Sequence, residues 1–432
     1  MTALAFKLDS PDIFGDDFAR HRGELPGAGL AWLEARRRAA MDAFLKTGIP
    51  NRRVEAWKYT DLANALASEL APAVRAARQD SEGGIFASVP GARLHLVNGF
   101  LEHVTEAAGL EAVDLVELDS DTPEWVSANL GMTAAGRNQP MGAVSLALMR
   151  GGVAVRVHED QTLHLSFANP ADDGETVSHA RILIVVEDGV SFRLLESHGA
   201  SSGAFANIGM ELVLKRGAKL EHVRVQEGGP NALHVTTLGA QIARDAEYRA
   251  LYVAMGARLA RLDAEVTLGA PGARATLHNV AALNAGIADT TTVMDHAASN
   301  TTSRQLFKSV VGGRGRAVNQ GRVAVRAGAV KSDSHQLFKA ILLSPTAEAD
   351  AKPELEIFAD DVICGHGTAI GALDEDALFY LRARGIPEHE AKGVLIRAFL
   401  EDAIEGFGGD VVHDVIAHRL DAALVTLGEA VP

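Results

Sequence analysis

Cysteine is almost absent from this sequence, since Cys364 is the only one in 432 residues. A single cysteine cannot form an internal disulfide, which fits a reducing compartment. No run of about 18 consecutive apolar residues occurs, and we therefore expect no membrane-spanning helix. The first ten residues lack a basic region followed by an apolar stretch, so no secretory signal is expected either. The sequence thus predicts a cytoplasmic protein.

Positive charge is also scarce, because 41 lysines and arginines face 56 aspartates and glutamates and leave a net charge of −15. Proteins that bind nucleic acid normally present a basic surface. The same holds for proteins that dock on an anionic membrane. We therefore expect neither nucleic acid nor a membrane among the partners.

Familiar catalytic motifs are missing as well. The glycine-rich stretch Gly312 to Arg316 lacks the lysine–hydroxyl ending of a phosphate loop, and His389 begins no H-E-x-x-H metal motif. No dinucleotide fingerprint and no nucleophile elbow occurs. The scattered histidines, such as His222, His234 and His278, are typical of exposed or hydrogen-bonded strand residues. We expect no catalytic residue in this chain and no nucleotide bound by it.

Glycine, in contrast, is abundant, and short alternating runs fill the region between about Ala87 and Gly371. In Val153 to Val157, for example, valine occupies every second position. Alternation with period two is typical of half-buried strands, and glycine marks the turns between them. The middle of the chain is therefore predicted to be mainly β.

A repeat runs through this region. Similar turn-plus-strand segments begin 28, 28 and 27 residues apart, at Gly189, Gly217, Asp245 and Gly272. Later, Ser303 to Val310 recurs as Ser334 to Ile341, 31 residues on. A near-constant period indicates a β-solenoid, in which each coil is buried against its neighbours. An antiparallel β-sandwich is the alternative, which the scarcity of tight Asn-Gly and Asp-Gly hairpin turns disfavours.

Both ends of the chain have helical patterns. From about Pro11 to Leu70 apolar residues recur at helical spacing, and Gly48 ends the main helix. The following segment predicts a surface turn in which Trp57 and Tyr59 are half-buried. Beyond Gly371 we expect three more helices.

In this C-terminal part, Asp374 to Asp376 form an acidic first helical turn. Gly385 and Pro387 separate the first helix from the second, and Asp410 caps the third. The predicted domains are a helical N-terminal domain (1–85), a β-helix core (86–370) and a helical C-terminal domain (371–432).

One local cluster has the composition of a metal site. Cys364 and His366 lie two residues apart, beside Asp360 and Asp361. Residues i and i+2 of a strand share a face, and thiolate and imidazole both bind iron. Two ligands cannot complete a four-coordinate site, so the others would come from another chain. The alternative is a turn that happens to contain a cysteine.

The same region carries a long motif, which comprises Lys331 to Gln336, Leu342 to Val362, Cys364 to Gly367 and Gly371 to Pro387. It resembles the core signature of the SufB/SufD family of iron–sulfur cluster assembly proteins. The segment from Arg52 to Asp61 is similar to the N-terminal motif of the SufD members, whereas SufB members are usually longer and richer in cysteine. Gly365 replaces a serine found in many relatives.

This resemblance implies a right-handed parallel β-helix core with helical domains at both ends. It further implies a non-catalytic scaffold subunit that pairs with a SufB paralogue and binds SufC, an ABC-type ATPase, through the C-terminal helices. Docking candidates there are Leu378, Phe379, Pro387 and Phe399. In isolation the chain could form a homodimer.

The resemblance also implies a transient cofactor, a nascent iron–sulfur cluster shared with SufB. Its candidate ligands at the SufB interface are His366 and Cys364, with Asp360 and Asp361 in support.

Two other functions are compatible with the residues. A β-helix carbohydrate-active enzyme would use a carboxylate cluster such as Glu354, Glu356, Asp360 and Asp361. The aromatic content of 5% is low for a sugar-binding groove. A purely structural partner would never contact the cluster, and His366 would then be an interface packing residue.

Overall fold

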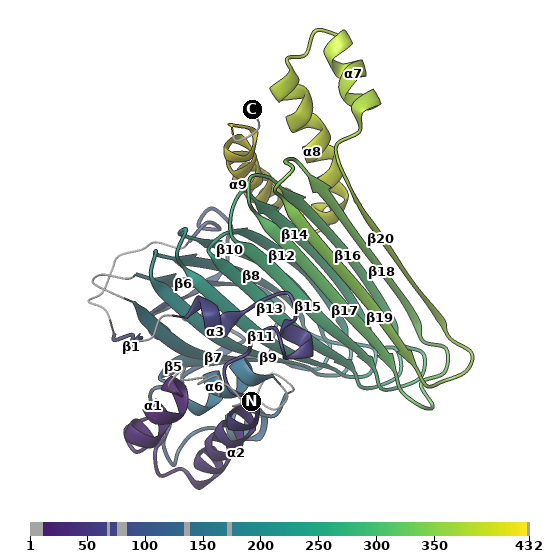
Figure 1. Cartoon of the computed structure of the whole chain (residues 1–432). Coiled ribbons are helices and arrows are strands. Elements are labelled where there is room, and N and C mark those ends of the chain that lie inside the picture. The colour runs from purple at the N-terminus through teal and green to yellow at the C-terminus, as the bar shows by residue number, and fades with distance from the viewer. Residues whose placement is uncertain (1–11, 67–69, 76–83, 134–138, 171–174, 430–432) are drawn as a thin grey trace, which may run out of the picture.

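The computed structural model of the protein describes residues 12–66, 70–75, 84–133, 139–170 and 175–429. Two long sheets form the body of the molecule, and helices from the N-terminal and C-terminal parts of the chain lie beside them (Figure 1). The fold is mainly β, with a parallel β-solenoid of about eight turns, as the sequence predicts.

Strands that follow one another along the solenoid alternate between the two sheets, so each coil contributes one strand to each. The first sheet contains, in spatial order, β19 (Glu348–Ile357), β17 (Arg316–Val325), β15 (Ile287–His296), β13 (Leu259–Leu268), β11 (Leu233–Ile242), β9 (Ala204–Leu214), β7 (Thr176–Val186), β5 (Gly151–Val157) and β4 (Leu110–Asp114), and the short β1 (Ala71–Pro72) pairs with β7. The second contains β20 (Ile363–Gly371), β18 (Asp333–Leu342), β16 (Thr302–Val311), β14 (Arg274–Leu283), β12 (Glu247–Gly256), β10 (Lys219–Gly228), β8 (Ser191–Ala200), β6 (Gln161–Asn169), β2 (Ala92–Val97) and β3 (Phe100–Val104).

The strand pairing explains the sequence repeat. Phe192 is paired in register with Leu220, and Leu220 in turn with Tyr248. Ser303 is paired with Ser334, which accounts for the later echo. Coil-to-coil pairing is parallel, and antiparallel pairs among the described strands occur only at the N-terminal end, between β2 and β3 and between β4 and β5. This pairing excludes the β-sandwich.

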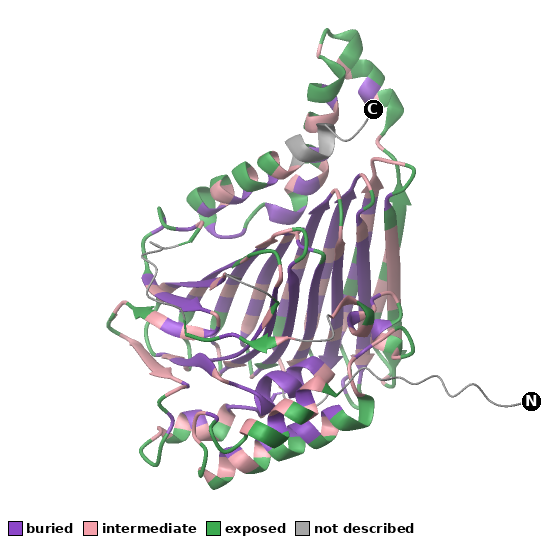
Figure 2. Cartoon of the chain, turned by 60° about the vertical axis from the view of Figure 1, so that its left-hand side comes forward, coloured by how far each residue is buried: buried purple, intermediate pink, exposed green. Residues whose placement is uncertain are grey.

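The space between the sheets, called the lumen below, holds the largest apolar core. Alternate residues of each strand point into it, and Figure 2 shows the resulting burial along the strands. Near the C-terminal end of the solenoid the rings of Phe307 and Phe338 stack with their centres 4.9 Å apart. Burial of apolar surface makes the main favourable contribution to the free energy that stabilises such stacked coils.

The helices of the N-terminal part are α1 (Ile13–His21), α2 (Ala31–Thr47), the 3₁₀ turn η1 (Glu55–Trp57), α3 (Leu62–Ala65), α4 (Glu124–Asn129) and α6 (Pro140–Ala147). Helix α2 ends as predicted at Gly48, whose φ of 69° suits glycine and whose N–H donates to the Phe44 carbonyl. Helix α6 packs against the outer face of β7, β9 and β11.

The prediction of a surface turn with two half-buried aromatics is wrong for Trp57, which is fully buried, and right for Tyr59. The Arg261 guanidinium, from β13, lies over the Trp57 ring and donates to the Ala56 carbonyl at 2.7 Å. Thr60 donates to the Asp289 carboxylate on β15. These partners lie some 200 residues away in the chain. They hold residues 56–60, called the strap below, against the outer face of the first sheet.

The C-terminal helices are α7 (Glu375–Ala383), α8 (Glu388–Ile404) and α9 (Gly409–Glu429). Asp374 caps α7, and Gly385 and Pro387 separate α7 from α8 as expected. Asp410 lies in the first turn of α9 rather than at its cap, because the helix already begins at Gly409. The predicted domain limits remain predictions. No described helix has the length and apolar character needed to cross a membrane.

Candidate functional site

Cys364 and His366 lie on β20, which forms the end of its sheet. They are paired in register with Ser334 and Gln336 of β18, whose side chains are buried. Residues in register on parallel strands share a face, so both candidate ligands are on the lumen side of the last coil. Cys364 is half-buried against the lumen core, and His366 is exposed.

The surroundings of Cys364 favour the protonated thiol. Burial raises its pKa, and the nearby Asp333 carboxylate acts in the same direction. A hydrogen bond with the backbone of Ser334 acts in the opposite direction and lowers the Cys364 pKa. Because a thiol binds metal as the thiolate, ligation of iron by Cys364 has to release a proton.

The two aspartates predicted as supporting residues lie in the turn between β19 and β20, and both are exposed. Asp361 has a φ of 56°, and its carbonyl accepts a 2.7 Å hydrogen bond from the Lys331 N–H. In the described part of the chain no group of three or more His, Cys, Asp or Glu residues is arranged to hold a metal ion. Within those residues, therefore, Cys364 and His366 are too few to hold a metal ion by themselves.

The predicted docking residues differ in exposure. Phe379 on α7 is 73% exposed, whereas its neighbour Leu378 is buried. Pro387 caps α8, and the half-buried Phe399 ring lies 4.7 Å from the Lys308 ammonium. A mostly apolar hollow of about 400 Å3 lies between α8 and the ends of β18 and β20, and its lining includes Ile341, Ile370, Leu373, Leu395 and Phe399.

Two of the four carboxylates that suggested a carbohydrate enzyme, Glu354 and Glu356, are engaged in surface ion pairs. Glu354 lies 3.3 Å from the Lys352 ammonium, which also contacts Glu55 at 2.6 Å. Glu356 lies 3.2 Å from the Arg322 guanidinium. These contacts are those of a solvent-exposed charged strand.

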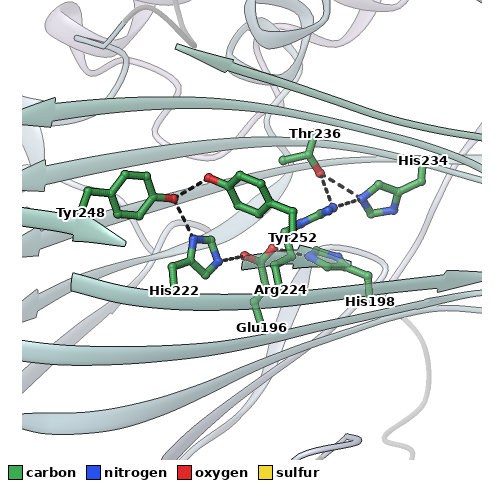
Figure 3. Close-up of polar contacts among 8 residues, drawn as sticks. All are labelled: Glu196, His198, His222, Arg224, His234, Thr236, Tyr248 and Tyr252. Atoms are coloured by element: carbon green, nitrogen blue, oxygen red, sulfur yellow. Dashed lines mark hydrogen bonds and ion pairs between the residues drawn. The ribbon is translucent and has the colours of Figure 1, made fainter. Parts of the chain in front are cut away.

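A buried polar network, which the sequence analysis did not predict, occupies the lumen further toward the N-terminal end (Figure 3). At its centre the Glu196 carboxylate contacts His198 and lies 2.5 Å from His222 Nε2 and 3.3 Å from Arg224 Nε. Burial acts to raise the Glu196 pKa, but the His198 and His222 imidazoles hold that pKa well below its usual value. Glu196 is therefore an ionised carboxylate inside the solenoid.

The rest of the network is linked to this carboxylate. Arg224 donates to Thr236 at 2.9 Å and contacts His234 Nε2 at 2.7 Å. The Tyr248 hydroxyl joins His222, at 3.0 Å, to the Tyr252 hydroxyl, at 2.7 Å. Burial raises the pKa of both tyrosines and lowers that of His234.

The sequence prediction that these histidines are exposed or hydrogen-bonded is confirmed. His222 and His234 are hydrogen-bonded, but they are buried, while His278 is half-buried and contacts the Ala403 carbonyl at 2.8 Å. The repeat period contained a usable signal, because it aligns Glu196, Arg224 and Tyr252 in one column of the second sheet.

Taken together, the molecule is a parallel β-solenoid protein with helices in the N-terminal and C-terminal parts of the chain, and its last strand carries a cysteine and a histidine on one face. Residues 167–399 match the family described as "SUF system FeS cluster assembly, SufBD core domain", and residues 11–165 match the SufBD protein N-terminal region. The chain therefore belongs to the SufBD family of iron–sulfur cluster assembly proteins.

Individual relatives agree with this assignment. The iron–sulfur cluster assembly protein SufD of Escherichia coli is 26% identical over 89% of this chain and 91% of its own length. A SufBD family protein of Synechocystis is 28% identical over 86% of each chain. A chloroplastic protein of Arabidopsis thaliana is 27% identical over 91% of this chain and 86% of its own.

Proposed function

We propose that this chain is a non-catalytic scaffold subunit on which nascent iron–sulfur clusters are built and from which they are passed on. It pairs with a SufB paralogue and with the ATPase SufC in the cytosol. Membership of the SufBD family supports this proposal, as does the similarity to the iron–sulfur cluster assembly protein SufD of Escherichia coli. The sequence carries no phosphate loop, so ATP hydrolysis is assigned to a partner.

The observation that carries the assembly site is the position of Cys364 and His366. Both face the lumen side of the terminal strand β20, where the sheet ends. Thiolate and imidazole are suitable ligands for iron, and further ligands from a partner would complete the coordination. The cluster is thus a transient substrate shared by two chains.

The C-terminal helices provide the proposed docking surface for the ATPase. The exposed Phe379 on α7 and the apolar hollow beside α8 are the features that a protein partner would cover. Aromatic side chains in well-packed apolar pockets commonly dominate the binding energy of such interfaces.

A pull-down tests the partnership directly. The tagged full chain is expressed in its native host, and the recovered proteins are identified by mass spectrometry. We expect a longer paralogue and an ABC-type ATPase in the recovered material. Recovery of the chain alone, as a monomer or homodimer, would contradict the proposed complex.

A further inference from the structure

Gln336 has a buried amide that forms no hydrogen bond with the described residues. Its side chain is only 2% exposed, and both Oε1 and Nε2 are without a partner. Buried polar groups in proteins are nearly always hydrogen-bonded, because leaving them unpaired costs free energy. In the sheet register, the residue next to Gln336 on the last strand is the candidate ligand His366.

The Gln336 side chain points into the lumen, toward the opposite sheet. A methyl group added to Gly321 of β17 would lie 2.9 Å from Gln336 Nε2 and 2.7 Å from Phe338 Cζ. Glycine at position 321 therefore leaves the space that this amide occupies. Since residues in register share a face, the His366 side chain lies on the same side of the sheet as that amide.

The preceding coil places a second carboxamide in the same column. Gln305 of β16 is paired in register with Gln336. Its Oε1 accepts a 2.7 Å hydrogen bond from the Thr292 hydroxyl, and its Nε2 is without a partner. Carboxamides at successive positions of parallel strands can form hydrogen-bonded ladders. The column Gln305, Gln336 and His366 thus leads from the solenoid interior to its last coil.

We propose that Gln336 is a positioning residue for His366, an inference that rests on the proposed role of His366 as an iron ligand. In the proposed arrangement, which the unpaired amide reaches by rotation of its side chain, Gln336 Oε1 accepts the N–H of one imidazole nitrogen and Gln336 Nε2 donates to Gln305 Oε1. A hydrogen bond to one ring nitrogen fixes the tautomer and leaves the lone pair of the other nitrogen available to metal. The amide ladder therefore orients the imidazole before iron arrives.

The tautomer of His366 is the direct test. The full chain is labelled with 15N-histidine, and ring nitrogen shifts are recorded by NMR at alkaline pH, where an ordinary imidazole is neutral. The His366 signals are identified by their loss in His366→Ala. We expect a single tautomer in the unmodified chain and a mixture of both in Gln336→Leu.

Gln226 provides a matched control. It lies on β10, is 1% exposed, and both polar atoms of its amide are likewise without a partner. Gln226→Leu should leave the His366 tautomer unchanged. A mixture already present in the unmodified chain, or the same single tautomer in Gln336→Leu, would overturn the proposal. Unchanged signals of the other histidines show that a variant is folded. If those signals change in Gln336→Leu, the measurement is made on Gln336→Met instead.

A second measurement separates this inference from the proposed function. In the assembled complex, Gln336→Leu should weaken iron binding by about 10- to 100-fold, as is usual for loss of a group that orients a ligand. If His366→Ala leaves cluster formation unchanged, the ligand role fails. The tautomer experiment uses the chain without iron or partners, so it still decides whether Gln336 holds His366.

Discussion

The Arg261 guanidinium lies 3.8 Å from the centre of the Trp57 ring. The same guanidinium pairs with Asp263 at 2.6 Å and with Asp289, and all of these groups are buried. One arginine of the solenoid wall thus holds both an aromatic ring of the N-terminal strap and two carboxylates of the first sheet.

Replacing Arg261 by methionine should release the strap. Two buried carboxylates would lose their cation, a change that typically costs about 3–5 kcal/mol. We expect a lower urea midpoint and faster proteolysis between residues 50 and 66. Arg322→Met is the control, because the Arg322–Glu356 pair is exposed and such pairs contribute about 0–1 kcal/mol. Equal effects of the two variants would contradict this view of the strap.

Acid should destabilise the protein partly through His296. Burial lowers the pKa of His296 from its usual 6.5 to about 4, and its ring nitrogens contact Thr301 at 2.8 Å and Ser303 at 2.9 Å. Between these pH values the unfolded chain binds the proton and the folded chain does not. The stabilisation is complete above pH 6.5 and is lost as the pH falls toward 4, by about 3 kcal/mol at most.

Urea unfolding of His296→Gln at a series of pH values checks this prediction. The variant should lose less stability than the unmodified chain over the acid range. His389→Gln, at an exposed position on α8, should behave like the unmodified chain. Identical pH dependence in all three proteins would show that His296 does not contribute.

Phe379→Asp should weaken binding of the ATPase without unfolding the chain. Substitutions at exposed positions usually change stability by less than about 0.5 kcal/mol, whereas loss of an interface aromatic commonly costs about 2 kcal/mol or more. Titration calorimetry with purified SufC should therefore show at least about tenfold weaker binding. Leu45→Asp on α2, also at an exposed apolar residue, is the control. Unchanged affinity of the Phe379 variant would place the ATPase elsewhere.

Much of the fold is predictable because local patterns in the sequence determine it. The repeat that relates Phe192 to Leu220 is the strand register itself. The spacing of Cys364 and His366 likewise predicts their shared face, because alternation along a strand needs no knowledge of the partners.

The features that the sequence did not predict share one physical cause, which is contact between residues far apart in the chain. Trp57 is buried because Arg261 lies over its ring, and no local pattern contains that contact. His222 is buried beside Glu196, a partner in the neighbouring coil that becomes visible only when the strands are aligned.

The most direct test of the assembly site is the cluster content of complexes that contain His366→Ala. The variant is produced together with SufB and SufC, and iron and acid-labile sulfide are measured per purified complex. His335→Ala is the control, since His335 is an exposed histidine on the neighbouring strand that pairs with Asp333. We predict that both variants assemble and that only His366→Ala loses most of its cluster. Full cluster content in the His366→Ala complex would contradict the account and leave His366 as a packing residue of a purely structural partner.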